Sequence, residues 1–389
     1  MVILVINGLI DKTMKNRLNF KKMTLVGVLF FGLSLAACSD DDNAILIETS
    51  GITMMSDMNT AITEGAMGDF IAIHGTGLDY ENIDSILVND VRVEMLETYS
   101  EKDVLYMQIP VKLPRKETDK IYIFNSKGVK ELNFKTLAPK LKLTRMFNEY
   151  TKPGDTIMIY GDYFDLYEID SLNAVVDFNG KESKVIASLN TALIARVPLD
   201  VDKNIKVKVR GIKWDVEATC PGRYYDRGES FVMDFDEIMP DYAVNVVTDV
   251  EDPYRFSGNY LRVDDNVQLI EWDYFVKKSG VTYTDDMLAH PDNYVVKCEF
   301  RTANQFVTGK IGFDCWIYWA ATPMKWQVSD FVFQKTNTWE TISLPFNCVR
   351  SADYPDAANH STFDVRMDVE PEIVKNFAFD NFRICKKGD

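Results

Sequence analysis

Histidine is scarce in this chain, and its scarcity limits the chemistry that the protein can perform. The three histidines are His74, His290 and His360, and none stands in a Ser/His/Asp or Cys/His arrangement that would activate a nucleophile. The sequence therefore predicts a protein that is not an enzyme. A glycoside hydrolase stays open as an alternative, because that reaction needs only two carboxyl groups about 5 to 9.5 Å apart and the chain has 59 acidic residues.

Closely spaced cysteines are also absent, which excludes the usual zinc and redox motifs. Cys298 alternates with Val296 and Phe300 and so belongs to the apolar face of an expected strand. We expect buried free thiols, and one or two disulfides are the alternative for a protein of an oxidising compartment. This expectation covers Cys220, Cys298, Cys315, Cys348 and Cys385.

Basic residues are too few to balance the acidic ones. The chain has 43 Lys and Arg against 59 Asp and Glu, a formal net charge of −16. Nucleic acid and anionic lipid both require a basic face, so neither is expected as a direct partner. A neutral ligand fits better, and five of the six tryptophans lie after residue 270. This asymmetry directs the search for a binding site to the C-terminal half.

Long apolar runs are missing except for a short one near the N-terminus. Residues 23–37 are almost entirely apolar and follow a basic stretch, but they fall short of the about 20 residues that a transmembrane helix needs. Residues 1–37 are therefore predicted to be a signal peptide. The small residues before Cys38 resemble a bacterial lipobox, which implies that this cysteine carries a lipid. The acidic linker over 38–50 resembles the surface-export signal of Bacteroidetes lipoproteins, which implies a lipid anchor in the outer membrane and a protein that faces the medium.

An internal repeat organises the first half of the chain. The pattern of Gly-Asp, two isoleucines and a glycine at residues 68–75 recurs at residues 154–161, an offset of 86. Both copies alternate with period two and show almost no helical stripe. The glycine that closes each copy is expected where the chain turns after a strand. The repeat predicts two tandem β-sandwiches over 51–139 and 140–220, and each resembles the immunoglobulin-like IPT/TIG domain.

The repeat ends near Cys220, and a different domain is expected over residues 221–389. Runs with period-two alternation dominate it, and the one short helix is expected near 285–289. About 165 residues rich in strands are typical of a jelly-roll-like sandwich. The predicted fold class is all-β: two immunoglobulin-like sandwiches followed by a larger β-sandwich.

Residues 311–319 form the most informative strand of this last domain. Its odd-numbered residues share one face and read as core, whereas Asp314, Trp316 and Tyr318 share the other face. A carboxylate beside flat aromatic rings suits a sugar, whose C–H patches stack on the rings while polar groups reach its hydroxyls. For each aromatic residue a core position is the alternative. The predicted glycan-binding residues are Asp314, Trp316, Tyr318, Trp319, Trp326, Trp272 and Tyr274.

Two other tryptophans and three acidic residues are given other roles. Trp214 and Trp339 are expected to be structural. No cofactor is required, although Asp234 and Asp236 could meet Asp380 if the first and last strands of the domain pair. Calcium prefers oxygen ligands of this kind. The weak expectation is a structural calcium ion, against solvated surface acids as the default.

The whole mature chain resembles the surface glycan-binding proteins of Bacteroidetes polysaccharide-utilisation loci. The resemblance rests on the lipoprotein signal, the tandem IPT/TIG-like units and the tryptophan-rich C-terminal sandwich that ends in residues 377–384. It implies non-catalytic capture of a polysaccharide or oligosaccharide beside a TonB-dependent transporter and its lipoprotein partner. A surface adhesin or structural lipoprotein that binds protein partners is the alternative. The identity of the glycan, its linkage and the oligomeric state are not encoded in any motif.

Overall fold

The computed structural model describes residues 44–267, 273–303, 312–316, 320–322, 324–327, 332–347, 349–350, 362–367 and 376–388. Strands dominate throughout, as predicted. The predicted short helix is present as α2 (Asp285–Ala289), and the hydroxyl of Thr284 caps it by accepting from the backbone N–H of Met287. None of the described helices is long and apolar enough to cross a membrane.

The first domain is a sandwich of two antiparallel sheets. The five-stranded sheet has the order β2 (Asp57–Ala61), β1 (Glu48–Met54), β4 (Phe70–Thr76), β8 (Val104–Gln108), β7 (Thr98–Glu101). The four-stranded sheet has the order β10 (Gly128–Asn133), β9 (Lys120–Asn125), β5 (Ser85–Val88), β6 (Val91–Arg92). A short parallel pair joins β3 (Glu64–Ala66) to β11 (Lys135–Leu137). Strand β1 begins at Glu48, inside the stretch that we expected to be linker.

The second domain repeats this plan with its sheets joined. Its strand order is β12 (Lys142–Met146), β13 (Thr156–Asp162), β16 (Ala192–Arg196), β15 (Glu182–Leu189), β14 (Ala174–Phe178), β17 (Val207–Gly211), β18 (Val216–Thr219). Strand β15 pairs with β14 through its first half and with β16 through its second half, and a register shift between Val185 and Ala187 separates the two. The long strand therefore passes from one layer to the other at a bulge.

The sequence repeat is a structural repeat. The isoleucines of the two copies are buried in the equivalent strands β4 and β13. The expectation that Gly75 and Gly161 mark turns is wrong, because both lie within these strands. A Cβ atom on Gly75 would stand 1.9 Å from the carbonyl oxygen of Glu48, and one on Gly161 would stand 2.3 Å from that of Lys142. Glycine is required because the bulged neighbouring strand approaches closely.

The C-terminal domain is the larger sandwich that we predicted. One sheet has the order β21 (Val246–Val247), β22 (Tyr260–Val263), β31 (Phe377–Lys386), β24 (Tyr294–Thr302), β28 (Glu340–Pro345), and β19 (Ser230–Met233) pairs with β31. The facing sheet has the order β20 (Tyr242–Ala243), β23 (Tyr274–Ser279), β30 (Thr362–Met367), β25 (Gly312–Trp316), β27 (Met324–Gln327). A small sheet pairs β26 (Ala320–Thr322) with β29 (Val349–Arg350).

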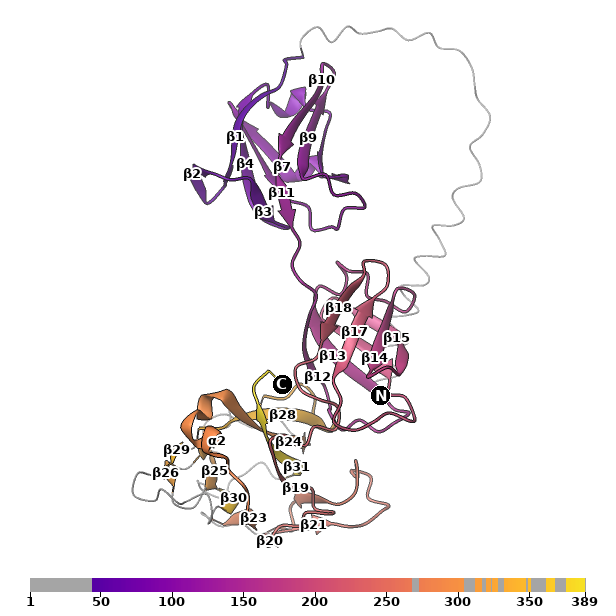
Figure 1. Cartoon of the computed structure of the whole chain (residues 1–389), viewed down its shortest axis with the longest axis vertical. Coiled ribbons are helices and arrows are strands. Elements are labelled where there is room, and N and C mark those ends of the chain that lie inside the picture. The colour runs from indigo at the N-terminus through magenta and orange to yellow at the C-terminus, as the bar shows by residue number, and fades with distance from the viewer. Residues whose placement is uncertain are drawn as a thin grey trace, which may run out of the picture.

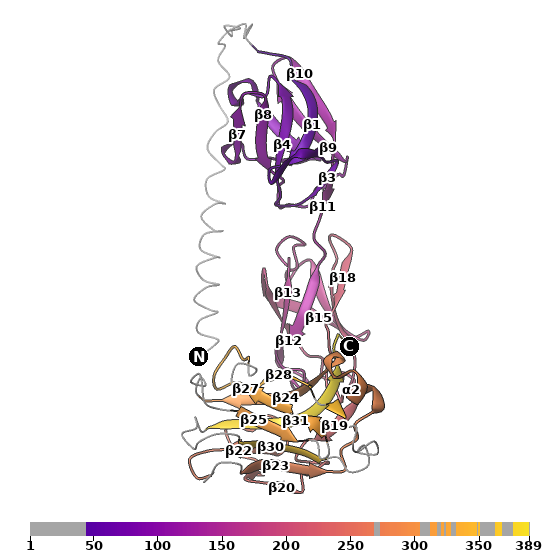
Figure 2. The same ribbon diagram turned by 90° about the vertical axis from the view of Figure 1, so that its left-hand side faces the viewer.

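The core of the C-terminal domain lies between its two large sheets. Phe275, Phe363 and Val365 face it from one sheet, and Phe300 and Phe379 face it from the other. Figures 1 and 2 show the three domains strung out in chain order, with the C-terminal sandwich at the end opposite the first domain. The described cysteines Cys220, Cys298 and Cys385 are buried free thiols, as expected.

Candidate functional site

The outer face of the five-stranded C-terminal sheet carries an aromatic and charged surface. In β30, Phe363 and Val365 point into the core, so the alternating residues Asp364 and Arg366 belong to the opposite face. The backbone register places Lys277 of β23 opposite Asp364, and Tyr274 opposite Arg366. A bulge between Tyr274 and Val276 brings Tyr274 and Lys277, three residues apart, onto one side of the sheet.

Tyr274 is held between two cations. The ammonium nitrogen of Lys277 lies 5.3 Å from the centre of its ring, and the guanidinium carbon of Arg366 lies 5.0 Å from it. Such cation–π contacts fix the ring orientation and contribute about 0.5 to 1 kcal/mol each at exposed sites. Tyr242 on the edge strand β20 stands opposite Lys277 and is 51% exposed. The two tyrosines and their cations form a preformed surface for a ligand with both apolar C–H faces and hydroxyl groups.

Asp364 supplies a carboxylate within this surface. Its side chain is buried beneath its neighbours, and its Oδ1 atom has no hydrogen-bond partner among the described residues. Burial raises the pKa of Asp364 above its ordinary value, whereas Lys277 and Arg366 act to lower it. A buried polar atom that lacks a partner is costly. A ligand hydroxyl that donates to this oxygen would satisfy it.

The same sheet contains two of the residues predicted from the alternating tryptophan-rich strand. The backbone of Asp314 in β25 is in register with Arg366, and that of Trp316 is in register with Asp364. Together with Tyr274, these three predicted residues occupy adjacent positions of one sheet. Trp272, Tyr318 and Trp319 lie outside the described residues, as does Cys38, so their proposed roles stay predictions.

Trp326 is a correction to the predicted site. Its side chain is 0% exposed, lies in the main core cluster, and donates from Nε1 to the carbonyl oxygen of Pro345 at 3.0 Å. A ring that is fully enclosed offers no surface to a sugar. The expectation for Trp339 is confirmed: it is buried, and its Nε1 donates to the carbonyl oxygen of Tyr254 at 2.7 Å.

Sequence reasoning missed Tyr242, Lys277, Asp364 and Arg366. The alternation of residues 362–367 contained a usable signal, since Phe363 and Val365 predict a core face and leave a carboxylate and a guanidinium on the other. Tyr242 gave no such signal, because β20 has only two residues. Its position depends on pairing with β23, about 35 residues further along the chain.

The expected calcium ligands have other work in this structure. Asp234 Oδ1 accepts from the backbone N–H groups of Asp236 and Ile238, and Asp236 Oδ1 accepts from that of Asn259. Among the residues that the structure describes, no three acidic, histidine or cysteine side chains lie close enough together to hold a metal ion. Asp234, Asp236 and Asp380 therefore do not fit calcium as a preformed cluster, and they act as turn and strand carboxylates.

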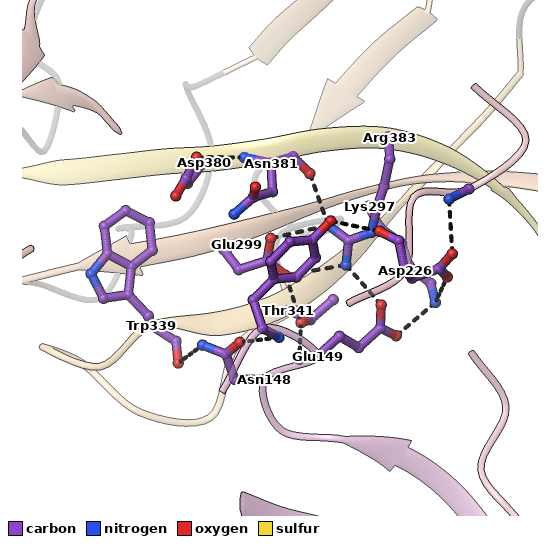
Figure 3. Close-up of polar contacts among 12 residues, drawn as sticks. Asn148, Glu149, Asp226, Lys297, Glu299, Trp339, Thr341, Asp380, Asn381 and Arg383 are labelled. Atoms are coloured by element: carbon purple, nitrogen blue, oxygen red, sulfur yellow. Dashed lines mark hydrogen bonds and ion pairs between the residues drawn. The ribbon is translucent and has the colours of Figure 1, made fainter. Parts of the chain in front are cut away.

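The other large sheet of this domain contacts the second domain through a buried ion network (Figure 3). Arg383 of β31, which is 0% exposed, donates to Glu149 of the second domain at 2.7 Å and to Glu299 of β24 at 3.0 Å. Lys297 donates to the second oxygen of Glu149 at 2.7 Å and lies 3.5 Å from Asp226. One carboxylate of the second domain thus pairs with two cations of the C-terminal domain.

Backbone hydrogen bonds surround this network. The N–H of Thr341 donates to the carbonyl oxygen of Phe147 at 2.9 Å, and Asn148 donates to that of Trp339 at 3.1 Å. The hydroxyl of Tyr150 donates to the carbonyl oxygen of Asp226 at 2.7 Å. The two domains are therefore joined through side chains and backbone alike. This contact uses the outer face of one sheet and leaves the aromatic face of the opposite sheet open.

Burial dominates the electrostatics of the junction. It raises the pKa of Glu299 above its ordinary value, although Arg383 acts against that shift. At Asp226 burial also acts upward, but Lys297 and Arg383 hold the pKa below its usual value. Burial further raises the pKa of the Cys385 thiol to about 12. The groups are positioned to satisfy each other, and such buried pairs are costly to break.

A polar cavity of about 270 Å³ lies beside this junction. Residues such as Asn204, Arg223 and Glu229 line it, and its lining contains no aromatic side chain. Sugar recognition in proteins relies on apolar or aromatic surface with a few polar groups. The open face around Tyr274 fits that description, and this cavity does not.

Fold and site together define a multidomain ligand-binding protein that carries its binding sandwich at the end of a row of immunoglobulin-like domains. Residues 142–221 match the family model described as IPT/TIG domain. Residues 224–386 match the model described as surface glycan-binding protein B xyloglucan binding domain. By these matches the chain is a surface glycan-binding protein of the kind that joins TIG domains to a C-terminal glycan-binding domain.

Solved structures agree on the fold. The surface glycan-binding protein PbSGBP-B from Prevotella bryantii is 15% identical with a TM-score of 0.55, over 88% of this chain and 99% of that one. SGBP-B from a complex xyloglucan utilization locus in Bacteroides uniformis is 15% identical with a TM-score of 0.48, over 88% of this chain and all of that one. Comparison with curated protein sequences gave no match.

Proposed function

We propose that this protein captures a neutral glucan of the xyloglucan class, without cleaving it, on the outer face of the five-stranded C-terminal sheet. The observation that carries the proposal is the position of Tyr274 between Lys277 and Arg366, beside the buried carboxylate of Asp364. The description of the matching domain family supports the choice of glycan.

The chemistry of the surface fits a neutral sugar chain. Pyranose rings stack through their C–H faces on flat aromatic rings, and charged groups nearby exchange hydrogen bonds with hydroxyls. Each stacking contact is weak, so a row of them favours a polymer over a single sugar. The net charge of −16 disfavours strongly acidic polysaccharides.

The proposal places the protein on the outer membrane, anchored by lipid on Cys38 and facing the medium. The row of domains would then hold the glycan-binding face away from the anchor. A TonB-dependent transporter and its lipoprotein partner would receive the captured chain. The match to a glycan-binding family and not to a catalytic one supports capture without hydrolysis.

Affinity electrophoresis tests this proposal. Gels that contain xyloglucan or mixed-linkage glucan should retard the full chain, and an acidic polysaccharide should not. Tyr274→Ala and Trp316→Ala should each weaken retention about three- to tenfold, because an aromatic contact contributes about 0.5 to 1.5 kcal/mol beyond its buried area. A suitable control is Tyr163→Asn in the second domain, where asparagine tolerates the positive φ of 70°.

Three results would count against the proposal. Uniform migration of wild type in every neutral polysaccharide would overturn glycan capture and favour the adhesin alternative. Retention unchanged by Tyr274→Ala and Trp316→Ala would place the site elsewhere. Release of reducing sugar from a polysaccharide, abolished by Asp364→Asn, would make the protein a hydrolase.

A further inference from the structure

We infer that the first domain carries a second glycan-binding face, on the outer side of its sheet β2-β1-β4-β8-β7. This inference rests on the proposed function, since it assigns to the first domain the same class of neutral polysaccharide. Figure 2 shows this sheet face-on, with β7, β8, β4 and β1 side by side. No described element of the other two domains packs against it, and its side chains carry the argument.

A pair of stacked tyrosines dominates this face. Tyr99 of β7 and Tyr106 of β8 stand directly opposite one another in the register. Their ring centres lie 6.0 Å apart with an interplanar angle of 25°, and Tyr99 is 60% exposed. Phe70, on the same face of β4, is 52% exposed. The pair forms a flat aromatic shelf of the kind that sugars stack on.

The internal repeat shows that the fold does not require these aromatic residues. The second domain has the same strand pairing, in which Ala187 opposes Ile194 where the first domain has Tyr99 opposite Tyr106. Thr156 occupies the position equivalent to Phe70. The second domain folds with small, aliphatic and hydroxyl side chains at these sites. The exposed rings of the first domain therefore call for an explanation other than folding.

A shallow polar depression continues the shelf. It has a volume of about 390 Å³ and lies over the ends of β1, β4 and β8, with Glu48, Ser50, His74 and Asp103 in its lining. His74 and Val104 are opposed in the register, one row along the face from Tyr106. A ring of His74 bonds the hydroxyl of Thr53 at 2.9 Å, which fixes its orientation. Carboxylates, a hydroxyl and an imidazole beside an aromatic shelf suit the hydroxyl groups of a neutral sugar.

The occupant that this face favours is a polysaccharide and not a protein. The central parts of protein interfaces are depleted of charged residues, whereas Glu48, Glu101 and Asp103 border this shelf. A long glycan chain held at the C-terminal sheet can also meet the first domain. The second contact is then intramolecular, so it raises the apparent affinity for polymer without changing that for a short oligosaccharide.

Hydrogen–deuterium exchange on the full chain tests the face directly. Addition of a neutral polysaccharide should protect backbone amides in residues 97–108, as well as in the C-terminal sheet. The protection over residues 97–108 should persist in a Tyr274→Ala/Trp316→Ala protein. Absence of protection there, with the C-terminal sheet protected, would overturn this inference and leave the proposed function standing. Protection of residues 97–108 alone would support this inference and overturn the proposed C-terminal site.

Affinity electrophoresis supplies the second test. Tyr99→Ala/Tyr106→Ala should weaken retention by polymer about tenfold and leave the binding of a short oligosaccharide unchanged. The matched control is Tyr122→Ala, a half-buried tyrosine on the opposite sheet of the same domain, which should retain wild-type mobility. Equal retention of the double variant and wild type, at equal thermal stability, would contradict the inference.

Discussion

Two residues of strand β31 illustrate how the same buried surface treats charges differently. Arg383 is surrounded by Glu149 and Glu299, and burial, which would lower its pKa, is outweighed by these carboxylates. Asp380, on the same side of the sheet, has no cation among the groups that shift it. Burial raises the pKa of Asp380 well above its ordinary value, and Glu299 raises it further. Ionised Asp380 is therefore a cost that the fold carries.

We predict that Asp380→Asn stabilises the protein at neutral and alkaline pH. A carboxyl whose folded-state pKa is raised contributes stability that is complete below its ordinary pKa of about 4 and is lost as the pH rises through the folded value. Asparagine stays neutral and keeps the oxygen that accepts from the N–H of Asn381. The melting temperature should rise by about 2 to 4 °C for each kcal/mol recovered, and the gain should vanish near pH 4.

Thermal melts at pH 4 and pH 8, with and without EDTA, would check this prediction. A variant less stable than wild type at pH 8, together with a loss of stability of wild type in EDTA, would instead favour calcium at Asp380. The control is Asp200→Asn, at an exposed carboxylate of the second domain that pairs with Lys181.

At the scale of elements, strand alternation was a reliable guide within a strand and silent between strands. It placed Phe313 and Trp316 on opposite faces of the predicted strand, and the register puts Trp316 beside Asp364. The pairing of β25 with β27 sets Trp326 opposite Phe313, on the core side. That register depends on the chain between the two strands. Sequence could not supply it, and for this reason Trp326 was assigned to the wrong face.

We predict that Trp326→Ala abolishes binding by unfolding the C-terminal domain. Removal of a fully buried large aromatic side chain costs about 3 to 5 kcal/mol. Trp326→Phe keeps most of the packing and loses the hydrogen bond to Pro345, so it should fold and bind glycan like wild type. Chemical denaturation followed by tryptophan fluorescence, beside affinity electrophoresis, would measure both. A folded Trp326→Ala protein with specifically weakened glycan binding would return Trp326 to the site.

At the scale of the whole molecule, the second domain is more than a spacer. Its Glu149 is the counter-charge for two buried cations of the C-terminal domain. The first domain shares no such network with the second among the described residues, where the ion pairs printed by the structure stay within each of these two domains. The second and C-terminal domains should therefore fold and act as one unit.

We predict that a fragment of residues 140–389 is as stable as the corresponding part of the full chain, whereas residues 221–389 alone are much less stable. Removal of the second domain leaves Arg383 and Lys297 without Glu149, and the loss of one partner of a buried pair costs about 3 to 5 kcal/mol. Glu149→Gln should show part of the same loss in the full chain. Lys208→Ala breaks an exposed pair with Glu217 and should cost at most about 1 kcal/mol.

Differential scanning calorimetry of the two fragments and the two variants would decide the matter. Equal melting temperatures for residues 140–389 and 221–389 would show that the ion network is dispensable for the C-terminal fold.

The sequence by itself determined the all-β class, the structural repeat, the short helix and the family, because these follow from local alternation, turn residues and an internal periodicity. It also selected the strand that carries Asp314 and Trp316. Only the tertiary structure decided which side chains share a surface: Tyr242 and Arg366 beside Tyr274, Trp326 in the core, and Glu149 between Arg383 and Lys297. These are contacts across strands and domains, and their register is set by packing between segments far apart in the chain.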